Sequence, residues 1–398
     1  MIGNEIKENI YWIGVNDRLT DLFEGMWPIP NGVSINSYLI LDNKNTLIDI
    51  TKAANAEEFI SQMYQFIDPK DLDYVIVNHL EPDHTGIMRV LRALAPQAQF
   101  IASTKAVPMI ESFYGIKDNV RDVKDGETLT LGEYTLQFFY APWVHWPETM
   151  VTYETTSKIL FPCDAFGGYG ALKGIIFEED LSSEDKIFYE KESLRYYANI
   201  VAKYSRMVLR AIDKLSGLEI KTICPSHGLI WRDNLGRIVE LYKKWASYAT
   251  EPGELGITLI YASMYGNCEK LMNAVVRGVG KAGVPIQVFD AARVHPGFIL
   301  PELWTKRGVI VGSPTYEAGI FFPVQNVLEI AMRKRMNDKK AAFFGSYGWK
   351  GGSIPKLEKM AEELRWEVHS TFPFKGGINK EILAQGEEFG EKFAESLK

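Results

Sequence analysis

Short apolar runs separated by turn residues make up most of the first 250 residues. Eight of these runs have the length and the β-branched or aromatic content of strands: NSYLIL, NTLIDI, DYVIVN, AQFIAS, YTLQFFYA, MVTYET, KILFPC and KTICPS. Turn-forming segments such as DNKN at 42–45 and DGE at 125–127 lie between them. Helical patterns interrupt the strands at roughly 53–67, 86–95, 183–215 and 235–247. This order predicts an α+β arrangement in which helices cover sheets.

A different pattern follows YATEPGELG at 248–256, a polar stretch broken by Pro and Gly that we interpret as a linker. Beyond it, five apolar strands are expected: GITLIYAS, PIQVFDA, GVIVGSPT, KAAFFGSYGW and EVHSTFPF. They alternate with helices expected at 268–282, 299–306, 323–336, 353–364 and from 380 to the end. Such alternation predicts a buried parallel sheet with helices on both faces, which is a doubly wound α/β domain. We therefore expect two domains, residues 1–250 and 255–398.

Composition narrows the class of protein. The 398 residues are 46% hydrophobic and 24% charged, as in an ordinary globular protein, and the net charge of −7 argues against a nucleic-acid partner. There is no apolar stretch of about 18 residues, so we expect no membrane span. Cys163, Cys224 and Cys268 are far apart and form no CxxC pair. Together with an N-terminus that lacks a signal-peptide pattern, this indicates the reducing cytoplasm.

Candidate metal ligands follow the ends of several predicted strands. Four of the six histidines and one aspartate are in this position, and two further carboxylates lie within the same HLEPDH segment at 79–84. Strand ends that share a sheet edge bring together residues that are distant in the sequence. The predicted metal site therefore contains His79, Glu81, Asp83, His84, His145, Asp164 and His227.

The HLEPDH segment has a second explanation when it is taken alone. An extended backbone would place His79, Glu81 and Asp83 on one side. A helix is expected just beyond, so Asp83 could instead be its N-cap and His79 a buried, hydrogen-bonded histidine. The matching positions of the other candidates favour the metal site. His295 and His369 have no such context, and we expect them to be surface or packing residues.

The donor types favour a redox-capable dinuclear centre. Mixed carboxylate and imidazole sites suit iron as well as zinc. Two ferrous ions carry a charge of +4 and the three carboxylates carry −3, so one bridging hydroxide would balance the site. The sequence does not exclude zinc.

Three loops after the parallel strands indicate a second ligand site. YASMYGNCEK precedes a helix and has the small and hydroxyl residues of a phosphate-binding loop, but it is neither a Walker A loop nor a GxGxxG loop. GSPTYEAG at 312–319 and FGSYGWKGG at 344–352 follow the third and fourth strands. An ATP- or NAD-binding domain remains an alternative. The candidate cofactor-binding residues are Ser263, Met264, Tyr265, Gly266, Asn267, Cys268, Pro314, Thr315, Tyr316, Glu317, Ser346, Tyr347, Gly348, Trp349, Lys350 and Gly351.

These motifs resemble two known families. HxExDH with the later His, Asp and His resembles the metallo-β-lactamase signature, with Glu81 where that signature has histidine. The loops resemble those of flavodoxin: Ser263 and Gly266 match its FMN phosphate loop, whereas Tyr265 and Cys268 replace hydroxyl residues. The combination resembles the flavodiiron proteins (A-type flavoproteins) over essentially the whole chain. It implies a metallo-β-lactamase-like αββα sandwich followed by a flavodoxin-like doubly wound sheet, with FMN and two non-haem iron ions.

The resemblance also implies roles. The metal ligands would divide into two sets joined by a bridge: His79, Glu81 and His145 on one iron, Asp83, His84 and His227 on the other, and Asp164 between them. Tyr196 would be a catalytic residue behind the ligands, with a helix-packing aromatic as the alternative. Tyr316 and Trp349 would stack on the flavin ring.

The implied function is the reduction of O2 to water, of NO to N2O, or of both. The runner-up is a dinuclear zinc hydrolase that carries a flavodoxin-like domain, and a third possibility is an electron carrier or sensor. An external donor is needed, either rubredoxin or reduced coenzyme F420. The resemblance implies a head-to-tail homodimer or a dimer of dimers. The basic run MRKRMNDKK at 332–340 is either a solvated helix end or a docking surface for an acidic redox protein.

Overall fold

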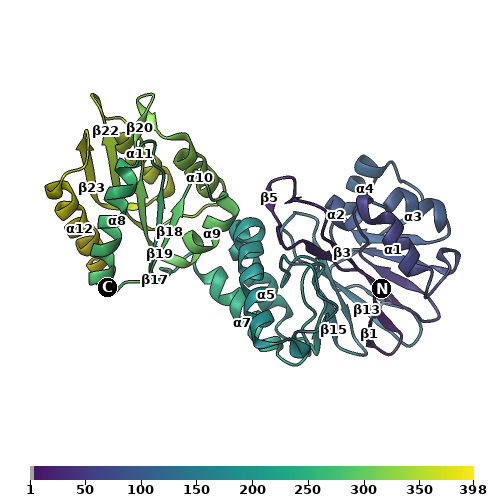
Figure 1. Ribbon diagram of the computed structural model, residues 1–398. Helices are drawn as coiled ribbons and strands as arrows, with labels where there is room; N and C mark the ends of the chain where they lie inside the picture. Colours follow the sequence, from purple (N-terminus) through teal and green to yellow (C-terminus); the bar gives the residue numbers. More distant parts are fainter. Residues whose placement is uncertain (1–3) are drawn as a thin grey trace. The chain divides into compact units, whose positions relative to one another are not determined.

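A computed structural model describes residues 4–398, and the chain divides into two units between Ala246 and Ser247 (Figure 1). Two sheets form the first unit. The larger has the order β1-β2-β7-β8-β9-β10-β11 and the smaller the order β12-β13-β14-β15-β16. The strands of the larger sheet are β1 (Asn4–Lys7), β2 (Ile10–Trp12), β7 (Tyr38–Ile40), β8 (Thr46–Ile48), β9 (Tyr74–Val77), β10 (Gln99–Ser103) and β11 (Val120–Val123). Those of the smaller sheet are β12 (Thr128–Thr130), β13 (Thr135–Tyr140), β14 (Met150–Glu154), β15 (Ile159–Phe161) and β16 (Thr222–Ile223).

Helices cover the outer side of the larger sheet and lie beside β15 of the smaller one (Figure 1). They are α1 (Ala56–Met63), α2 (Pro82–Thr85), α3 (Met88–Leu94), α4 (Ala106–Tyr114), α5 (Ser183–Tyr196), α6 (Ser205–Leu215) and α7 (Leu235–Ser247). Short 3-10 turns occur at Ala53–Asn55, Pro69–Asp71, Glu178–Asp180 and Ala202–Tyr204. Two small ribbons pair β3 (Val15–Asp17) with β6 (Val33–Ile35) and β4 (Leu22–Phe23) with β5 (Trp27–Pro28).

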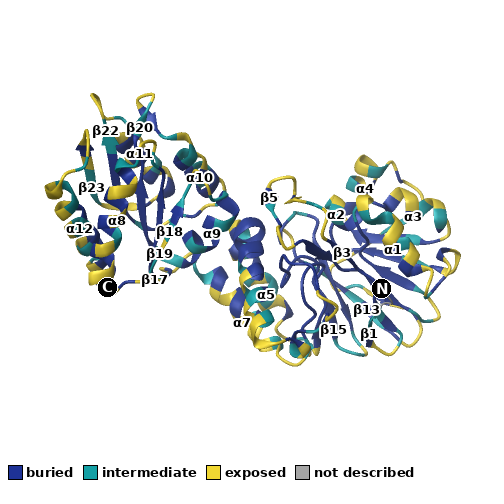
Figure 2. Ribbon diagram, in the orientation of Figure 1, coloured by how far each residue is buried: buried dark blue, intermediate teal, exposed yellow. Residues whose placement is uncertain are grey.

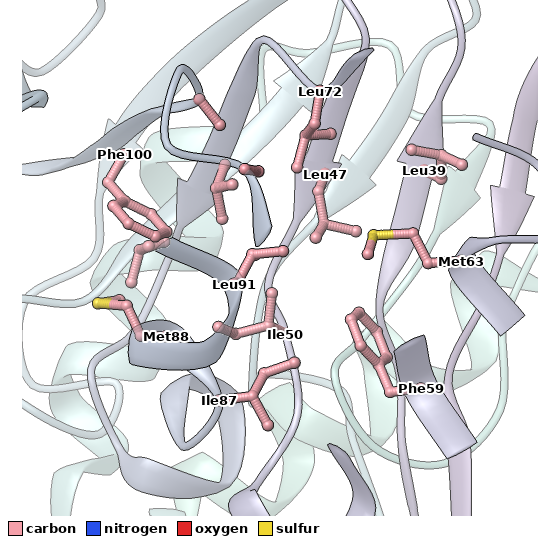
Figure 3. Packing of buried hydrophobic residues seen from close by; sticks show 14 of the residues in the cluster. Leu39, Leu47, Ile50, Phe59, Met63, Leu72, Ile87, Met88, Leu91 and Phe100 are labelled. Atoms are coloured by element: carbon pink, nitrogen blue, oxygen red, sulfur yellow. The ribbon is translucent and has the colours of Figure 1, made fainter. Parts of the chain in front are cut away.

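Successive side chains along the strands of the larger sheet point to opposite faces, and both faces are buried. Figure 3 shows the outer one, where Phe59 and Met63 of α1 lie near Leu39 and Leu47. On the inner face the Tyr38 ring lies 5.0 Å from the Phe161 ring of the smaller sheet. Sheet packs on sheet and helices cover the outside, which is the expected αββα sandwich.

One expected helix is interrupted. The sequence pattern predicts continuous helix over 183–215, but a π-helical turn at Tyr197–Val201 and a 3-10 turn separate α5 from α6. All five residues of the π-turn are buried. Because all five are buried, no exposed polar position marks the extra residue that widens the turn, so periodicity could not reveal it.

The second unit is a parallel sheet with the order β18-β17-β19-β22-β23. Numbered along the chain this order is 2-1-3-4-5, that of flavodoxin-like folds. The strands are β17 (Glu254–Tyr261), β18 (Ile286–Asp290), β19 (Lys306–Gly312), β22 (Lys340–Tyr347) and β23 (Glu367–Lys375), with a small ribbon of β20 (Thr315–Tyr316) and β21 (Gly319–Ile320). The helices are α8 (Asn267–Lys281), α9 (Pro296–Thr305), α10 (Phe322–Arg333), α11 (Ser353–Leu364) and α12 (Lys380–Glu395).

Burial agrees with the expected layers, because the central strands, such as β7 and β8 of the first unit and β19 of the second, are buried along all or most of their length, whereas the edge strand β23 is largely exposed or half-buried (Figure 2). Helix α9 begins three residues before the expected start, since the Nδ1 atom of His295 accepts a hydrogen bond from the Gly297 N–H and caps it. His369 is exposed, as expected. Between residues 4 and 398, no helix is long and apolar enough to cross a membrane.

Candidate metal centre and flavin cavity

The HLEPDH segment changes conformation in its middle. Glu81 is extended, with φ −60° and ψ 140°, and Pro82 starts the one-turn helix α2. The expected extended arrangement of residues 79, 81 and 83 therefore ends at Glu81, and Asp83 reaches the cluster from a helical turn. Asp83 is the second helical residue, so the interpretation of Asp83 as an N-cap is wrong.

One group of donors contains His79, Glu81, His145 and Asp164, whose potential ligand atoms all lie within 4.8 Å of one another. The Oε2 atom of Glu81 is 3.3 Å from Nε2 of His79 and 3.0 Å from Nε2 of His145. The Oδ2 atom of Asp164 is 3.4 Å and 3.3 Å from the same two nitrogens. Two carboxylates and two imidazoles thus converge on one point.

A second group contains Asp83, His84 and His227. The Oδ2 atom of Asp83 is 3.1 Å from Nε2 of His227 and 3.4 Å from Nε2 of His84. Here Asp164 presents its other oxygen, Oδ1, at 3.0 Å from His84 Nε2 and 3.5 Å from His227 Nε2. Asp164 therefore faces both groups with different oxygens, which is the geometry of a bridging carboxylate.

The two groups fit cations because their lone pairs face one another. The Nδ1 atom of His227 lies 2.7 Å from the Ser34 carbonyl oxygen, which can only accept a hydrogen bond. Nδ1 therefore carries the proton, and Nε2 turns a lone pair towards Asp83. Among the described residues both Asp83 oxygens and His227 Nε2 are buried without a hydrogen-bond partner. Buried polar atoms are rarely left so, and a bound metal ion would satisfy them.

Strand ends from both sheets supply these side chains. His79 follows β9 of the larger sheet. His145, Asp164 and His227 follow β13, β15 and β16 of the smaller sheet. The sequence predicted donors at strand ends, and the structure shows that the two sheets contribute to the same edge.

Three imidazoles, those of His79, His145 and His84, have raised pKa values in the protein alone. Burial opposes protonation, but hydrogen bonds with Glu148 and Glu81 outweigh it and raise the pKa of His79 to about 10. Asp164 and Glu81 likewise raise the pKa of His145 to about 10 against its burial. Burial also opposes the charge on His84, yet Asp83 and Asp164 raise its pKa to about 9.

A small apolar cavity of about 290 Å³ reaches the metal groups. Its walls include Leu22 and Phe23 of the β4–β5 hairpin together with Ile29, and Glu81 and Asp83 lie on its surface. No sequence signal pointed to this hairpin, because its two-residue strands carry no periodicity.

Tyr196 lies at the metal groups, at the end of α5. Its ring centroid is 5.6 Å from that of His227. The phenol is fully buried, and its oxygen has no hydrogen-bond partner among the described residues. Burial, reinforced by the charge of Asp164, raises the pKa of Tyr196 well above its ordinary value. The phenol therefore stays protonated and keeps an unused O–H.

Sequence reasoning missed two buried carboxylates beside the donors. Glu148 lies 2.7 Å from Nδ1 of His79 through its Oε1 atom. Asp49 accepts hydrogen bonds from the backbone and side-chain N–H groups of Asn78, the residue before His79. The only signal for Glu148 was its place three residues after His145. Asp49 was hidden within an apolar run.

A cavity of about 740 Å³ lies in the second unit, where the loops after β17, β19 and β22 meet. Of the candidate cofactor-binding residues, all except Gly266 and Gly351 line it, and Ala318 and Gly376 line it in addition. Gly266 has φ +84° and donates its N–H to Ser263 Oγ, 3.0 Å away, at the start of α8. This turn carries no charged side chain and leads into the N-terminus of the 15-residue helix α8 beside the cavity. A helix N-terminus offers free N–H groups and a positive dipole end, which favour the binding of a phosphate.

The site at these loops has the place and size for a flavin nucleotide. Ligands of the 2-1-3-4-5 fold bind where the first and third strands diverge, here β17 and β19. The Sγ atom of Cys268 lies 3.3 Å from Ser346 Oγ inside the cavity. Tyr265 and Trp349 are 88% and 91% exposed on its rim. No contact tests the expected stacking of Tyr316 and Trp349.

The basic run 332–340 lies at the wrong end of the sheet to serve this cavity. It precedes β22, whereas the cavity is at the carboxyl end of that strand, roughly 26 Å away for eight residues. Lys339 is buried and donates to the carbonyl oxygens of Trp304 and Lys306. The run is thus the end of α10 and the start of β22, with Arg333 and Arg335 exposed, and its docking role stays a prediction.

Known proteins match both units of the chain. Residues 33–228 match the model of the ODP family beta lactamase and residues 259–383 match flavodoxin. The chain is 34% identical to a nitric oxide reductase of Moorella thermoacetica, over 91% of this chain and 90% of that one. It resembles the solved rubredoxin oxygen:oxidoreductase of Desulfovibrio gigas, with TM-score 0.94, 29% identity and coverage of 99% and 98%. The flavodiiron protein of Giardia intestinalis gives TM-score 0.93 at 26% identity, with coverage of 100% and 97%.

The fold and the two sites define an oxidoreductase that combines a lactamase-like metal domain with a flavodoxin domain. The chain belongs to the flavodiiron protein family. Its cofactors are FMN and a pair of non-haem iron ions, and the residues of both sites fit them.

Metal binding should release protons. At pH 7 the raised pKa values keep His79, His84 and His145 protonated in the metal-free protein, whereas a metal ion binds neutral imidazole. Adding Fe²⁺ anaerobically to chelated protein at pH 7 should therefore release about three protons per chain, measured with a pH-stat.

The same pKa values predict how the stability of the metal-free protein depends on pH. They exceed the value of unfolded histidine, about 6.5. The protonated imidazoles thus stabilise the metal-free fold fully below that pH, and this contribution is lost as pH rises towards 9–10. The exposed control His369→Gln should leave the proton count unchanged. Release of less than one proton would contradict the assigned basicity.

Proposed function

We propose that the chain reduces O2 to water, NO to N2O, or both, at a diiron centre held by the seven donors. The balanced reactions are O2 + 4e⁻ + 4H⁺ → 2H2O and 2NO + 2e⁻ + 2H⁺ → N2O + H2O. The observation that carries the proposal is the pair of donor groups that share Asp164. The names of the Moorella thermoacetica and Desulfovibrio gigas relatives support these two substrates.

The cofactors and the residues have separate tasks. When bound, the pair of irons would supply two electrons and reduced FMN two more. The total of four electrons matches the reduction of O2 to water. The apolar walls of the cavity, which include Leu22, Phe23 and Ile29, would admit a small neutral molecule. The burial of the donors would keep bulk water away from the centre.

Tyr196 is a proton-bearing group beside His227 whose oxygen has no hydrogen-bond partner in the part of the chain that the structure describes. Its O–H would donate a hydrogen bond to a substrate or product oxygen at the centre. Because its raised pKa disfavours ionisation, it would orient and polarise the ligand while protons arrive through water.

Electrons would come from an external donor, rubredoxin or reduced coenzyme F420, in the cytoplasm. We also propose the head-to-tail homodimer, or a dimer of such dimers, in which the metal centre of one copy receives electrons through the flavin of another. The exposed Trp349 and Tyr265 on the rim would be covered in that assembly.

The function is tested by composition and turnover together. Protein made anaerobically in iron-replete medium should contain about two irons and one FMN per chain, measured by metal analysis and flavin absorbance. After reduction of the flavin it should consume O2 or NO in an electrode assay. Two zinc ions with little iron, and ester or β-lactam hydrolysis, would support the hydrolase instead.

Removing one hydroxyl tests the role of Tyr196. Tyr196→Phe should lower kcat for O2 or NO about 10²-fold, because a positioned hydrogen-bond donor is lost. Iron content should not change, since the phenol oxygen is not among the donor groups. Tyr197→Phe is the matched control, because its hydroxyl lies 2.7 Å from Ser205 Oγ and outside the donor groups. Equal rates in the two variants would assign Tyr196 to packing.

Complementation tests the head-to-tail assembly. Asp164→Asn should disable the metal centre, and Gly348→Trp should fill the flavin cavity, since open space surrounds that glycine. A hetero-oligomer isolated with two different tags should regain about half the wild-type rate, because one flavin then faces one intact metal centre. Each variant alone should be inactive. An inactive hetero-oligomer would show that each chain works by itself.

A further inference from the structure

A buried carboxylate that belongs to neither donor group contacts the metal centre. Glu148 is 2% exposed and lies on the loop that also carries His145. Its Oε1 atom is 2.7 Å from Nδ1 of His79 and accepts the backbone N–H of Leu80 at 3.0 Å. Its own carbonyl oxygen accepts a hydrogen bond from Ser103 Oγ at 2.6 Å, which fixes the loop on the end of β10.

The contact determines which nitrogen of His79 can bind a metal. In a metal-bound imidazole the nitrogen that faces a carboxylate carries the proton, so Nδ1 donates to Glu148. Nε2 is then free to act as a ligand, and it lies among Glu81 and Asp164. His227 has the same tautomer, but its Nδ1 donates to the Ser34 carbonyl.

That difference makes the two metal groups electrically unequal. A carbonyl partner is neutral, whereas Glu148 brings a full negative charge to the group of His79, Glu81 and His145. The Oε2 atom of Glu148 is buried and has no hydrogen-bond partner within residues 4–398. A carboxylate oxygen in that state needs nearby positive charge.

The charge count changes accordingly. Three carboxylates among the donors carry −3, and Glu148 adds a fourth negative charge at hydrogen-bond distance from a donor. Among these residues, Glu148 therefore brings the negative charge that faces the two cations from −3 to −4.

We propose that Glu148 is a positioning residue that fixes the tautomer of His79 and stabilises the ferric state of the ion beside it. This inference rests on the proposed diiron function. A negative charge beside a ligand favours the more highly charged ion, and a hydrogen-bonded carboxylate makes the imidazole a stronger donor. Glu148 thereby makes the ion held by His79 the easier one to oxidise.

The test removes the charge and keeps the shape. In Glu148→Gln the amide oxygen still accepts from Nδ1 of His79, so the tautomer survives while the charge is lost. The matched control is Glu154→Gln on the neighbouring strand β14. Glu154 is also fully buried, but its oxygens accept hydrogen bonds from the backbone N–H groups of Thr156 and Ser157, at 2.6 Å each. Neither of these hydrogen bonds involves a residue of the two metal groups.

The measurement is a potentiometric titration of the FMN-containing holoenzyme followed by electron paramagnetic resonance, with iron per chain determined in parallel. Glu148→Gln should raise the reduction potential of the centre. A tenfold loss of ferric over ferrous affinity corresponds to about 59 mV for one electron. Affinity for added Fe²⁺ should fall about 10- to 100-fold, as for other partners of metal-bound histidines. Glu154→Gln should keep the wild-type potential and affinity.

Other outcomes overturn the inference. It fails if Glu148→Gln keeps the wild-type potential, or if Glu154→Gln shifts the potential equally. Should Glu148→Gln not fold, Glu148→Asp retains the charge at a greater distance and should shift the potential in the same direction by less; no shift there also overturns it. A wild-type protein that binds no iron would instead refute the proposed function.

Discussion

Three carboxylates and four imidazoles share one buried cluster, and this concentration of charge constrains the rest of the first unit. Taking such groups out of water is costly unless opposite charge accompanies them. In the protein alone the cost is met by protonated imidazoles against ionised carboxylates, which explains the raised pKa of His79, His84 and His145. Metal ions replace those protons. Metal binding at this cluster therefore exchanges the protons of the imidazoles for metal ions. The fold must hold the donor side chains in place in both states.

Hydrogen bonds from behind the donors supply that rigidity. The carbonyl of Ser34 holds His227 and the carboxylate of Glu148 holds His79. Asp49 ties down Asn78, from which the HLEPDH segment departs. The partners come from strands and loops of both sheets, so the packing of sheet on sheet is what aligns them.

The sequence predicted the parts of this architecture that depend on local pattern. Ligand candidates could be found because each follows an apolar strand, and the flavin loops because each follows a parallel strand. It could not predict the helical start at Pro82, since an extended and a helical Asp83 are both compatible with HLEPDH. Glu148 and the hairpin of Leu22 and Phe23 act through contacts with residues distant in the sequence, and no motif or spacing predicts those contacts. The π-turn after Tyr196 could not be predicted, because all five of its residues are buried and no exposed polar position marks the extra residue.

The glutamate in the middle of HLEPDH has a physical explanation in this setting. Its Oε2 atom lies within 3.3 Å of both His79 and His145, so one oxygen serves a group whose other members are imidazoles and Asp164. A histidine at position 81 would supply a nitrogen but no charge. The donors would then carry −2, and two divalent ions would leave a buried excess of positive charge that grows with each electron removed. Glu81 limits that excess at the ion that Glu148 also faces through His79. Both carboxylates thus favour one side of the centre for oxidation, and they act on it from two directions: Glu81 as a member of the donor group and Glu148 from behind His79.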